Sequence, residues 1–560
     1  MNRGTKTLLW TVLTVLVAAV VIWLSLGDDD TGDVEEDSLA GEAAEIRAQR
    51  AAREAAEQAE AEERLAALRE ADEGEDIDDG PVEEDGEFRF PPSFSHRFRG
   101  PGGDLWSMSS PQIVDLNGDG AMDIVFGTGY ERQPADHGKP DGGFVFAISG
   151  ATNRTIWEVG VPGEIYSTPK FIDVDDKGQM DVIVGGREGV FVALSGEDGE
   201  LLWAVDPEAI AEQERPYNFY TPAVIDDIDG DGVADLVVTY GGDDQKAPYQ
   251  ERNHSYIALI SGATGDVIRR YRTPDRNETY CSPVVYTGAD GRPWVAFGTG
   301  GETHEGSAWR APLSSLQDGS FPRVVEEIVE PTTHKGVIAP INAADITGDG
   351  HQDLIVRPFD GRTILIEGRS GRPLWTHEPE EQESYHGPAL AVLDDGELGL
   401  LVSNGTGIFP AYTGTSHYLL RASDGEVLWS HEDDLSPVGA PVSVDLTGDG
   451  IDEILFFSGA NMFRRAMTRI HVLRTSELEL STHEQSLSIL ATPILADLDD
   501  RGRLELVVPG SRMEPGQRPS PESVSWRLLR LELDADTPER RTWAGYMGTD
   551  ASGVFSADIE

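Results

Sequence analysis

Short acidic turns recur along this chain, and their oxygen-bearing residues have the spacing of ligands for a hard cation. In the clearest copy, Asp227, Asp229, Asp231 and Asp235 occupy offsets 1, 3, 5 and 9, and Gly232 at offset 6 permits the chain to reverse. Oxygens two residues apart on a tight turn can converge on Ca²⁺, and a carboxylate from the next strand can complete the shell. The pattern therefore predicts calcium binding.

Three other turns carry the same pattern with small changes of ligand type. They comprise Asp115, Asn117, Asp119 and Asp123; Asp345, Thr347, Asp349 and Asp353; and Asp445, Thr447, Asp449 and Glu453. Mg²⁺ fits these turns less well, because it resists replacing its waters with so many protein ligands. We therefore predict Ca²⁺ as the cofactor, with about four ions per chain.

Two further turns keep most of the acids but carry a basic residue where the third ligand would be. They comprise Lys177 among Asp173, Asp175 and Asp181, and Arg501 among Asp497, Asp499 and Glu505. A side-chain cation neutralises clustered carboxylates that would otherwise repel one another. We expect a salt bridge to replace the metal in these two turns.

The elements that position these turns form an internal repeat, which begins each time with a small residue and a proline. The prolines are Pro111, Pro169, Pro222, Pro283, Pro340, Pro388, Pro441 and Pro493. Each proline precedes an aliphatic segment, in most copies an acidic turn, and then further apolar segments. Four short strands repeated every 50–60 residues or so are typical of propeller blades. The sequence predicts an all-β, eight-bladed β-propeller, with seven blades as the alternative.

The fourth segment of several repeats ends in tryptophan, at Trp157, Trp203, Trp375 and Trp429. We expect these rings to pack between neighbouring blades, because a large apolar ring stabilises most when it is buried.

The turn-plus-strand units resemble FG-GAP (integrin-α-like) repeats, which are called VCBS-like repeats in bacteria. The tails, such as ALSGEDGELLW, are similar to pyrroloquinoline-quinone-like propeller repeats. Together the two resemblances cover about residues 105–545. The FG-GAP resemblance implies calcium ligation at the turns that match the motif, a propeller fold and an extracellular binding role.

Strands alternate in direction along a blade, so the acidic turns and the long insertions are expected on opposite faces. Loops on a rigid scaffold often carry function, so we predict that the insertion face binds the ligand. Aromatic residues around a concave mouth suit sugars or peptides, although they can also simply pack between blades. The candidates for this face are Trp106, Tyr166, Tyr220, Tyr280, His304, Trp309, His334 and His386.

No motif of hydrolytic or phosphate chemistry stands out, so the favoured prediction is a non-catalytic binding or scaffold module for a protein or glycan. The alternative is a propeller enzyme, either quinoprotein dehydrogenase-like or polysaccharide lyase-like. Quinoprotein alcohol dehydrogenases generally carry adjacent cysteines, whereas Cys281 stands alone. A lyase would need a base and a neutralising cation, for which His386 and Arg357 are available.

Residues 1–27 have the features of a transmembrane signal anchor. Arg3 and Lys6 precede an uncharged run from Leu8 to Leu26, and such a run is about 28 Å long as a helix. The basic residues before the run orient the remainder of the chain outside the cytoplasm. A cleaved signal peptide is the alternative. We expect a periplasmic or cell-surface location in a bacterium.

The segment after the anchor is strongly acidic. Residues 28–87 hold 25 acids and five arginines, with an Ala/Glu/Arg helix predicted at about 41–71 and the propeller at 88–560. The whole chain has 101 acids against 44 bases, a formal charge of −57. Nucleic acid has the same sign of charge, so nucleic-acid binding is excluded as a function.

Overall fold

The computed structural model describes residues 90–100, 103–130, 142–206, 210, 218–242, 252–332, 334–408, 411–460, 467–513, 524–536 and 541–555. The predicted anchor at 1–27 and the acidic linker at 28–87, with its helix, lie outside these residues. Among the described residues, no helix is both long enough and apolar enough to cross a bilayer.

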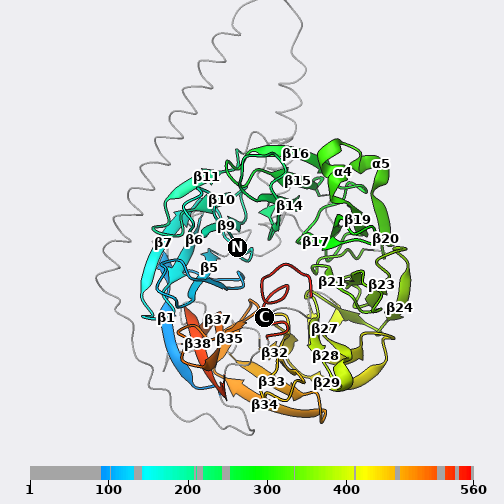
Figure 1. Cartoon of the computed structure of the whole chain (residues 1–560). Coiled ribbons are helices and arrows are strands. Elements are labelled where there is room, and N and C mark those ends of the chain that lie inside the picture. Colours follow the sequence, from blue (N-terminus) through cyan, green and yellow to red (C-terminus); the bar gives the residue numbers. More distant parts are fainter. Residues whose placement is uncertain are drawn as a thin grey trace, which may run out of the picture. The chain divides into compact units, whose positions relative to one another are not determined.

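Eight antiparallel sheets follow one another around a ring, which confirms eight blades rather than seven (Figure 1). Blade 1 consists of β4 (Gln112–Val114), β5 (Asp123–Gly129), β6 (Gly143–Ile148) and β7 (Thr155–Val161). Blade 2 consists of β8 (Lys170–Ile172), β9 (Asp181–Gly185), β10 (Phe191–Leu194) and β11 (Leu201–Ala204). Blade 3 consists of β12 (Asn218–Phe219), β13 (Ala223–Ile225), β14 (Asp235–Gly241), β15 (Tyr256–Ile260) and β16 (Val267–Arg272). Blade 4 consists of β17 (Val284–Thr287), β18 (Pro293–Gly298), β19 (Ala308–Pro312) and β20 (Glu326–Val329), with helices α4 (Leu313–Asp318) and α5 (Phe321–Val324).

The second half of the ring repeats this plan. Blade 5 consists of β21 (Asn342–Ala344), β22 (Asp353–Val356), β23 (Thr363–Ile366) and β24 (Pro373–His377). Blade 6 consists of β25 (Gln382–Glu383), β26 (Ala389–Val392), the 3₁₀ turn η1 (Asp394–Gly396), β27 (Leu398–Ile408), β28 (Ala411–Arg421) and β29 (Val427–Asp433). Blade 7 consists of β30 (Ser436–Pro437), β31 (Val442–Val444), β32 (Glu453–Gly459), β33 (Thr468–Arg474) and β34 (Glu479–Gln485). Blade 8 contains β35 (Leu487–Ile489), β36 (Ile494–Ala496), β37 (Arg503–Met513) and β38 (Val524–Asp536).

The ring is closed by the N-terminal end of the described chain. Strand β1 (Pro92–Arg97) pairs antiparallel with β38 and becomes the outermost strand of blade 8, so that Ser95 lies opposite Leu529. Figure 1 shows the blue β1 beside the orange-red β38. The short hairpin β2 (Arg99–Gly100) and β3 (Gly103–Asp104) then leads into blade 1. Hydrogen bonds between the two chain ends hold the ring shut.

The middle strands of each blade are buried on both faces, because a neighbouring blade covers each face. Val125 and Val145 of blade 1, for example, share an apolar cluster with Val182, Val184 and Val192 of blade 2. Strands that are buried on both faces usually have continuous runs of apolar residues rather than alternating apolar and polar residues. The blade therefore gives each acidic turn a rigid base.

The tail tryptophans lie between blades, as predicted. The indole Nε1 of Trp157 donates to Gly196 O in the next blade (2.8 Å), Trp203 donates to Gly262 O (2.8 Å), and Trp375 donates to Ala422 O (2.9 Å). Trp429 meets Phe456 of blade 7 edge-on, with ring centroids 5.9 Å apart.

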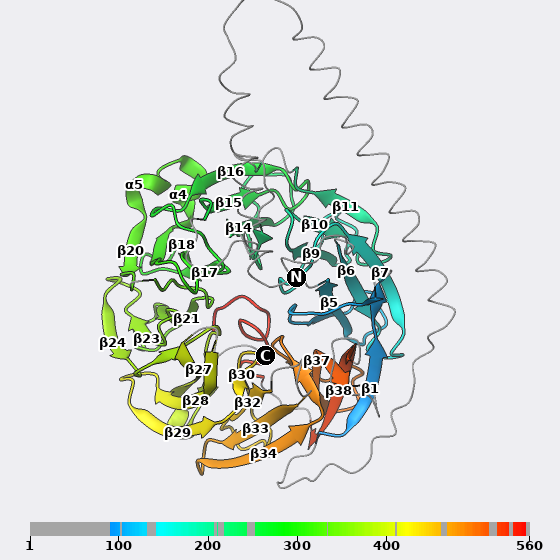
Figure 2. The same cartoon turned by 180° about the vertical axis from the view of Figure 1, so that it is seen from behind.

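The C-terminal segment, residues 541–555, lies inside the ring in both views (Figures 1 and 2). Its backbone extends the inner strands: Ser443 and Trp543 exchange two hydrogen bonds of 3.0 and 3.1 Å, and Ala343 N donates to Gly553 O at 2.8 Å. Trp543 is only 2 % exposed, and Lys170 Nζ donates to the carbonyls of Asp550 and Ala551. The centre of the propeller is therefore occupied by its own chain.

Candidate metal turns and channel mouth

Each acidic turn closes around its first aspartate. In blade 1, Asp115 Oδ1 accepts from Gly118 N (2.7 Å) and its Oδ2 accepts from Gly120 N (3.0 Å). Both glycines have positive φ, 72° and 87°, which glycine adopts without strain. Asp227, Asp345 and Asp445 accept two or more backbone N–H groups in the same way. These turns are preformed by backbone hydrogen bonds.

The acid at offset 9 links two turns on the same face of the propeller, because it accepts a hydrogen bond from each of them. Asp123 is fully buried; its Oδ2 accepts from Leu116 N (3.1 Å) and its Oδ1 accepts from Gly150 N (3.2 Å) in the third-to-fourth-strand turn. Asp235 bonds Ile228 N and Gly262 N in the same arrangement. Burial raises the pKa of Asp123 to about 6 and that of Glu453 to about 7. A nearby divalent cation would favour the ionised forms.

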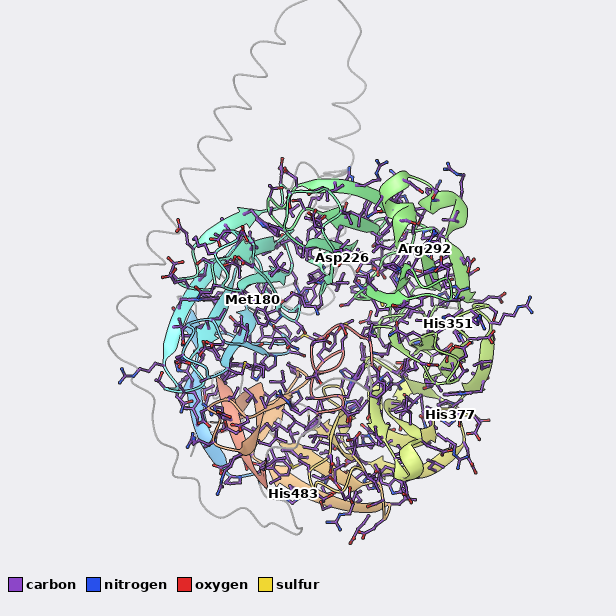
Figure 3. All side chains as sticks on the ribbon, viewed as in Figure 1. Met180, Asp226, Arg292, His351, His377 and His483 are labelled. Carbon is purple, nitrogen blue, oxygen red and sulfur yellow. The ribbon has the colours of Figure 1, made fainter. Side chains whose placement is uncertain are left out.

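Among the four turns predicted to bind calcium, the turn of blade 3 brings three carboxylates together. One carboxylate oxygen each from Asp227, Asp229 and Asp235 lies within 4.8 Å of the others, and the first two side chains are open to solvent. The donor set is all oxygen, which fits Ca²⁺. Figure 3 labels Met180, Asp226, Arg292 and His351, which belong to or adjoin the first-to-second-strand turns of blades 2–5 and follow one another around the ring.

The two turns with a basic residue place the cation on the second acid. Lys177 Nζ lies 2.5 Å from Asp175 Oδ2, and Arg501 forms an ion pair with Asp499. Asp173, Asp175 and Asp181 still have carboxylate oxygens within 4.8 Å of one another. The lysine is 68 % exposed, so its ion pair is screened by water.

Three of the predicted mouth residues form a row of rings on successive blades. The centroids of Tyr166 and Tyr220 are 5.5 Å apart, and those of Tyr220 and Tyr280 are 6.0 Å apart. Arg187 lies over the Tyr166 ring, with Cζ 5.6 Å from the centroid, and its Nε is 2.8 Å from Glu164 Oε2. Burial raises the pKa of all three phenols, so they remain neutral donors.

A chain of charged groups continues from this row toward blade 6. Tyr280 Oη donates to Glu278 Oε2 (2.8 Å), and the other oxygen of Glu278 is 3.3 Å from His304 Nδ1. Farther on, Lys335 forms an ion pair with Glu383, which accepts from Tyr412 Oη at 2.8 Å. We call this set the mouth arc: Tyr166, Arg187, Tyr220, Glu278, Tyr280, His304, Lys335, Glu383 and Tyr412.

The remaining predicted mouth residues are not part of this arc. Trp106 meets Trp526 edge-on with centroids 6.4 Å apart, and Trp309 lies in β19 with Nε1 3.1 Å from Thr299 Oγ1. His334 is exposed, at a φ of 61°. Burial lowers the pKa of His386 to about 4, and its backbone carbonyl accepts from the fully buried Arg357.

Two features have no counterpart in the sequence motifs. His431, Asp433 and His471 bring one potential ligand atom each within 4.8 Å, across blades 6 and 7. Their only signal in the sequence is the short H-x-D spacing at 431–433, because His471 belongs to another repeat. The second feature is a cavity of about 490 Å³ beside the C-terminal segment, lined by Gln112, Lys170 and Arg541 among others. Burial lowers the pKa of Lys170 to about 8.

A family model described as the FAM234A/B beta-propeller matches residues 112–311. Mouse (Mus musculus) Protein FAM234A is 26 % identical over 367 residues, covering 62 % of this chain and 62 % of that protein. Human (Homo sapiens) Protein FAM234B is 24 % identical over 381 residues, covering 64 % of this chain and 57 % of that protein. The chain thus spans less than two thirds of the length of these relatives. The assignment of the repeats to the FG-GAP class stays a prediction.

Among solved structures, a europium-containing methanol dehydrogenase is similar, with a TM-score of 0.49 and 11 % identity over 79 % of this chain and 93 % of that one. BamB from Moraxella catarrhalis has a TM-score of 0.43 and 14 % identity, covering 78 % of this chain and 97 % of that one.

Proposed function

We propose that this protein is a non-catalytic, calcium-stabilised propeller that binds a protein or glycan ligand at the mouth arc. The proposal includes display outside the cytoplasm by the N-terminal anchor. The observation that carries the binding role is the mouth arc itself, in which phenols, cations and carboxylates from successive blades adjoin one another. Proteins and glycans are both recognised by aromatic faces together with a few placed polar groups.

The arc is organised before any ligand arrives. Glu278 is 2 % exposed and Glu383 is 3 % exposed, and each is held by hydrogen bonds or ion pairs to its neighbours. Tyr166, Tyr280 and His304 are only half-buried, so part of each residue remains exposed to a partner. Fixed groups lose little side-chain entropy on binding, which favours affinity.

The positions of Arg357, His386 and Cys281 support a binding role over the enzyme alternatives. Arg357 is fully buried, and its guanidinium donates to Asn404, Thr363 and backbone carbonyls rather than facing a substrate. His386 is half-buried and hydrogen-bonds Arg357 through its backbone. Cys281 is fully buried and single, so it offers no cysteine pair for a quinone.

The ligand class is tested with the full chain, purified in detergent and applied to glycan and peptide arrays with Ca²⁺ present. We expect specific binding that Tyr280→Ala and Lys335→Ala each weaken at least tenfold. The matched control is Met180→Ala, because Met180 is 45 % exposed beside the acidic turn of blade 2. Binding that Met180→Ala weakens and the mouth variants do not would refute the choice of face.

The enzyme alternatives have direct assays. Incubation with pyrroloquinoline quinone would leave a stable chromophore on a dehydrogenase, and incubation with acidic polysaccharides would generate unsaturated sugars if the protein were a lyase. We expect neither signal. Either one, lost on mutation of a mouth residue, would replace the binding proposal.

A further inference from the structure

A group of histidines with one aspartate lies between blades 6 and 7, and none of its members belongs to an acidic turn or to the mouth arc. His431 and Asp433 are two residues apart on β29, so their side chains leave the same face of the strand. His471 comes from β33 of the next blade. One ligand atom from each residue lies within 4.8 Å of the other two.

The distances suit a small cation with nitrogen ligands. Asp433 Oδ2 is 3.1 Å from His471 Nε2. Two ligand atoms that are each about 2.05 Å from a tetrahedral zinc ion are about 3.3 Å apart. A zinc ion therefore needs only a small displacement of these two side chains.

Hydrogen bonds with neighbouring groups would orient His471 and Asp433 as metal ligands. His471 Nε2 is 3.0 Å from Ser458 Oγ and 3.1 Å from Asp433 Oδ2, and Nδ1 is 2.9 Å from Thr482 Oγ1. A metal at Nε2 would replace these contacts and require the tautomer in which Nδ1–H donates to Thr482. Asp433 Oδ1 accepts from Arg469 (2.7 Å) and Leu435 N (2.8 Å), while Ser458 Oγ donates to Oδ2 (2.9 Å). Such outer contacts orient metal ligands in proteins.

A further histidine has an unsatisfied nitrogen beside this group. His417 lies opposite His431 in the register of β28 and β29, and its ring is 5.7 Å from that of His471. Its Nδ1 is 2.8 Å from Ser403 Oγ, but its Nε2 is buried and has no hydrogen-bond partner among the described residues. A buried polar atom without a hydrogen-bond partner is destabilising, and a metal ion or its bound water would satisfy it.

The charges around the group favour a divalent cation. Arg469 contacts three carboxylates, those of Asp433, Asp434 and Glu484, so the four groups together carry two net negative charges. His431 is only half-buried, which leaves a route for an ion from solvent.

We propose that His431, Asp433 and His471 bind a zinc-class transition-metal ion, with the ring of His417 packed beside the group. Two imidazoles and a carboxylate favour such metals, whereas Ca²⁺ takes oxygen ligands. The site is thus chemically distinct from the acidic turns, and it does not depend on the binding role of the mouth arc.

The test is Zn²⁺ titration of the metal-stripped full chain by calorimetry, in buffer with millimolar Ca²⁺ to saturate the acidic turns. We expect one zinc per chain. His471→Gln and Asp433→Asn should weaken binding at least 100-fold, and Thr482→Val should weaken it about 10- to 100-fold through the outer contact. The control is His334→Asn, because His334 is exposed and Asn tolerates its φ of 61°.

A second measurement needs no variant. Co²⁺ added to the wild-type protein should give a visible absorption band of low-coordinate cobalt that Zn²⁺ abolishes and Ca²⁺ leaves unchanged. In carbethoxylation mapped by mass spectrometry, Zn²⁺ should protect His431. The proposal fails if wild-type protein binds no zinc in calcium buffer, or if folded variants at residues 433 and 471 bind it as wild type does.

Discussion

At the scale of single residues, the acidic turns show how one sequence position selects between a metal and a salt bridge. Blades 2 and 3 place three carboxylates at the same offsets, within the same 4.8 Å. The turns differ at offset 5, where blade 2 has Lys177 paired to Asp175 and blade 3 has Asp231. The clustered carboxylates can be neutralised either by a basic side chain of the protein or by a metal ion from solvent.

Replacing Lys177 with Asp should therefore create an additional calcium site in blade 2. The variant Lys177→Asp restores the ligand pattern of blade 3, and isothermal titration should find one more Ca²⁺ per chain than in wild type. Lys177→Gln is the control, because it removes the cation without supplying a carboxylate. Equal stoichiometry for all three proteins would contradict the exchange of lysine for metal.

Cys281 is predicted to be chemically inert in the folded protein. Burial raises the pKa of its thiol to about 12, so only about one molecule in ten thousand has the reactive thiolate at pH 8. Maleimide labelling at pH 8 should be negligible for the native chain and complete in denaturant. Rapid labelling of folded protein would show that the thiol opens to solvent.

At the scale of elements, the contact between successive blades is a repeated hydrogen bond rather than apolar packing alone. The indole of one blade donates to the third-to-fourth-strand turn of the next, and a Cβ at Gly199, Gly265 or Gly425 would lie within 3.1 Å of that ring. Blades 4 and 8 use arginines instead: Arg310 donates to Gly368 O and Arg530 donates to Gly150 O. The tail motif therefore needs a glycine here, because a larger residue would clash with the tryptophan ring of the preceding blade.

Substitution of Trp203 separates the hydrogen bond from the packing. Trp203→Phe should lower the free energy of unfolding by about 1–3 kcal/mol, because Gly262 O loses its donor. Trp203→Ala should cost about 3–5 kcal/mol, because it also leaves a cavity. Denaturant unfolding measures both changes. Leu201→Ala, on the same strand and 55 % exposed, should have little effect; a cost as large as that of Trp203→Ala would count against this account.

At the scale of the whole molecule, both ends of the described chain stabilise the ring. Strand β1 completes blade 8, and residues 541–555 fill the centre through bonds to blades 2, 5, 7 and 8. Thr542 and Trp543 also contact blades 6 and 7, where Thr542 Oγ1 donates to Asp452 at 2.8 Å. The central segment thus bridges blades that are far apart around the ring.

Removal of the central segment should destabilise the whole propeller. A chain ending at residue 540 exposes the apolar surroundings of Trp543 and leaves Lys170 Nζ without its two carbonyl acceptors. We expect a loss of several kcal/mol, seen as a clearly lower thermal midpoint and faster proteolysis. A chain ending at Phe555 is the control. An unchanged midpoint in the shorter chain would show that the segment is only an attachment.

Calcium should stabilise the ring as a whole. A ligand that binds only the folded state adds about 2.7 kcal/mol per site at a concentration of 100 Kd. Chelation should lower the thermal midpoint of the full chain, and readdition of Ca²⁺ should restore it, while Mg²⁺ should restore less. A midpoint indifferent to chelator would mean that the acidic turns bind no metal that matters for stability.

The sequence by itself determined the blade, because each blade is specified locally. The prolines before the inner strands, the acidic turn and the tail tryptophan all lie within one repeat, and the period between the prolines is enough to predict eight blades. The row of Tyr166, Tyr220 and Tyr280 was also predictable, because each tyrosine lies two or three residues before the proline of successive repeats.

Only the tertiary structure decided which residues of different repeats contact one another. The pairing of β1 with β38, the entry of residues 541–555 into the ring and the meeting of His431 with His471 all cross repeat boundaries and leave no periodic signal. A repeat records what each unit needs for its own folding, whereas contacts between units depend on the closed ring.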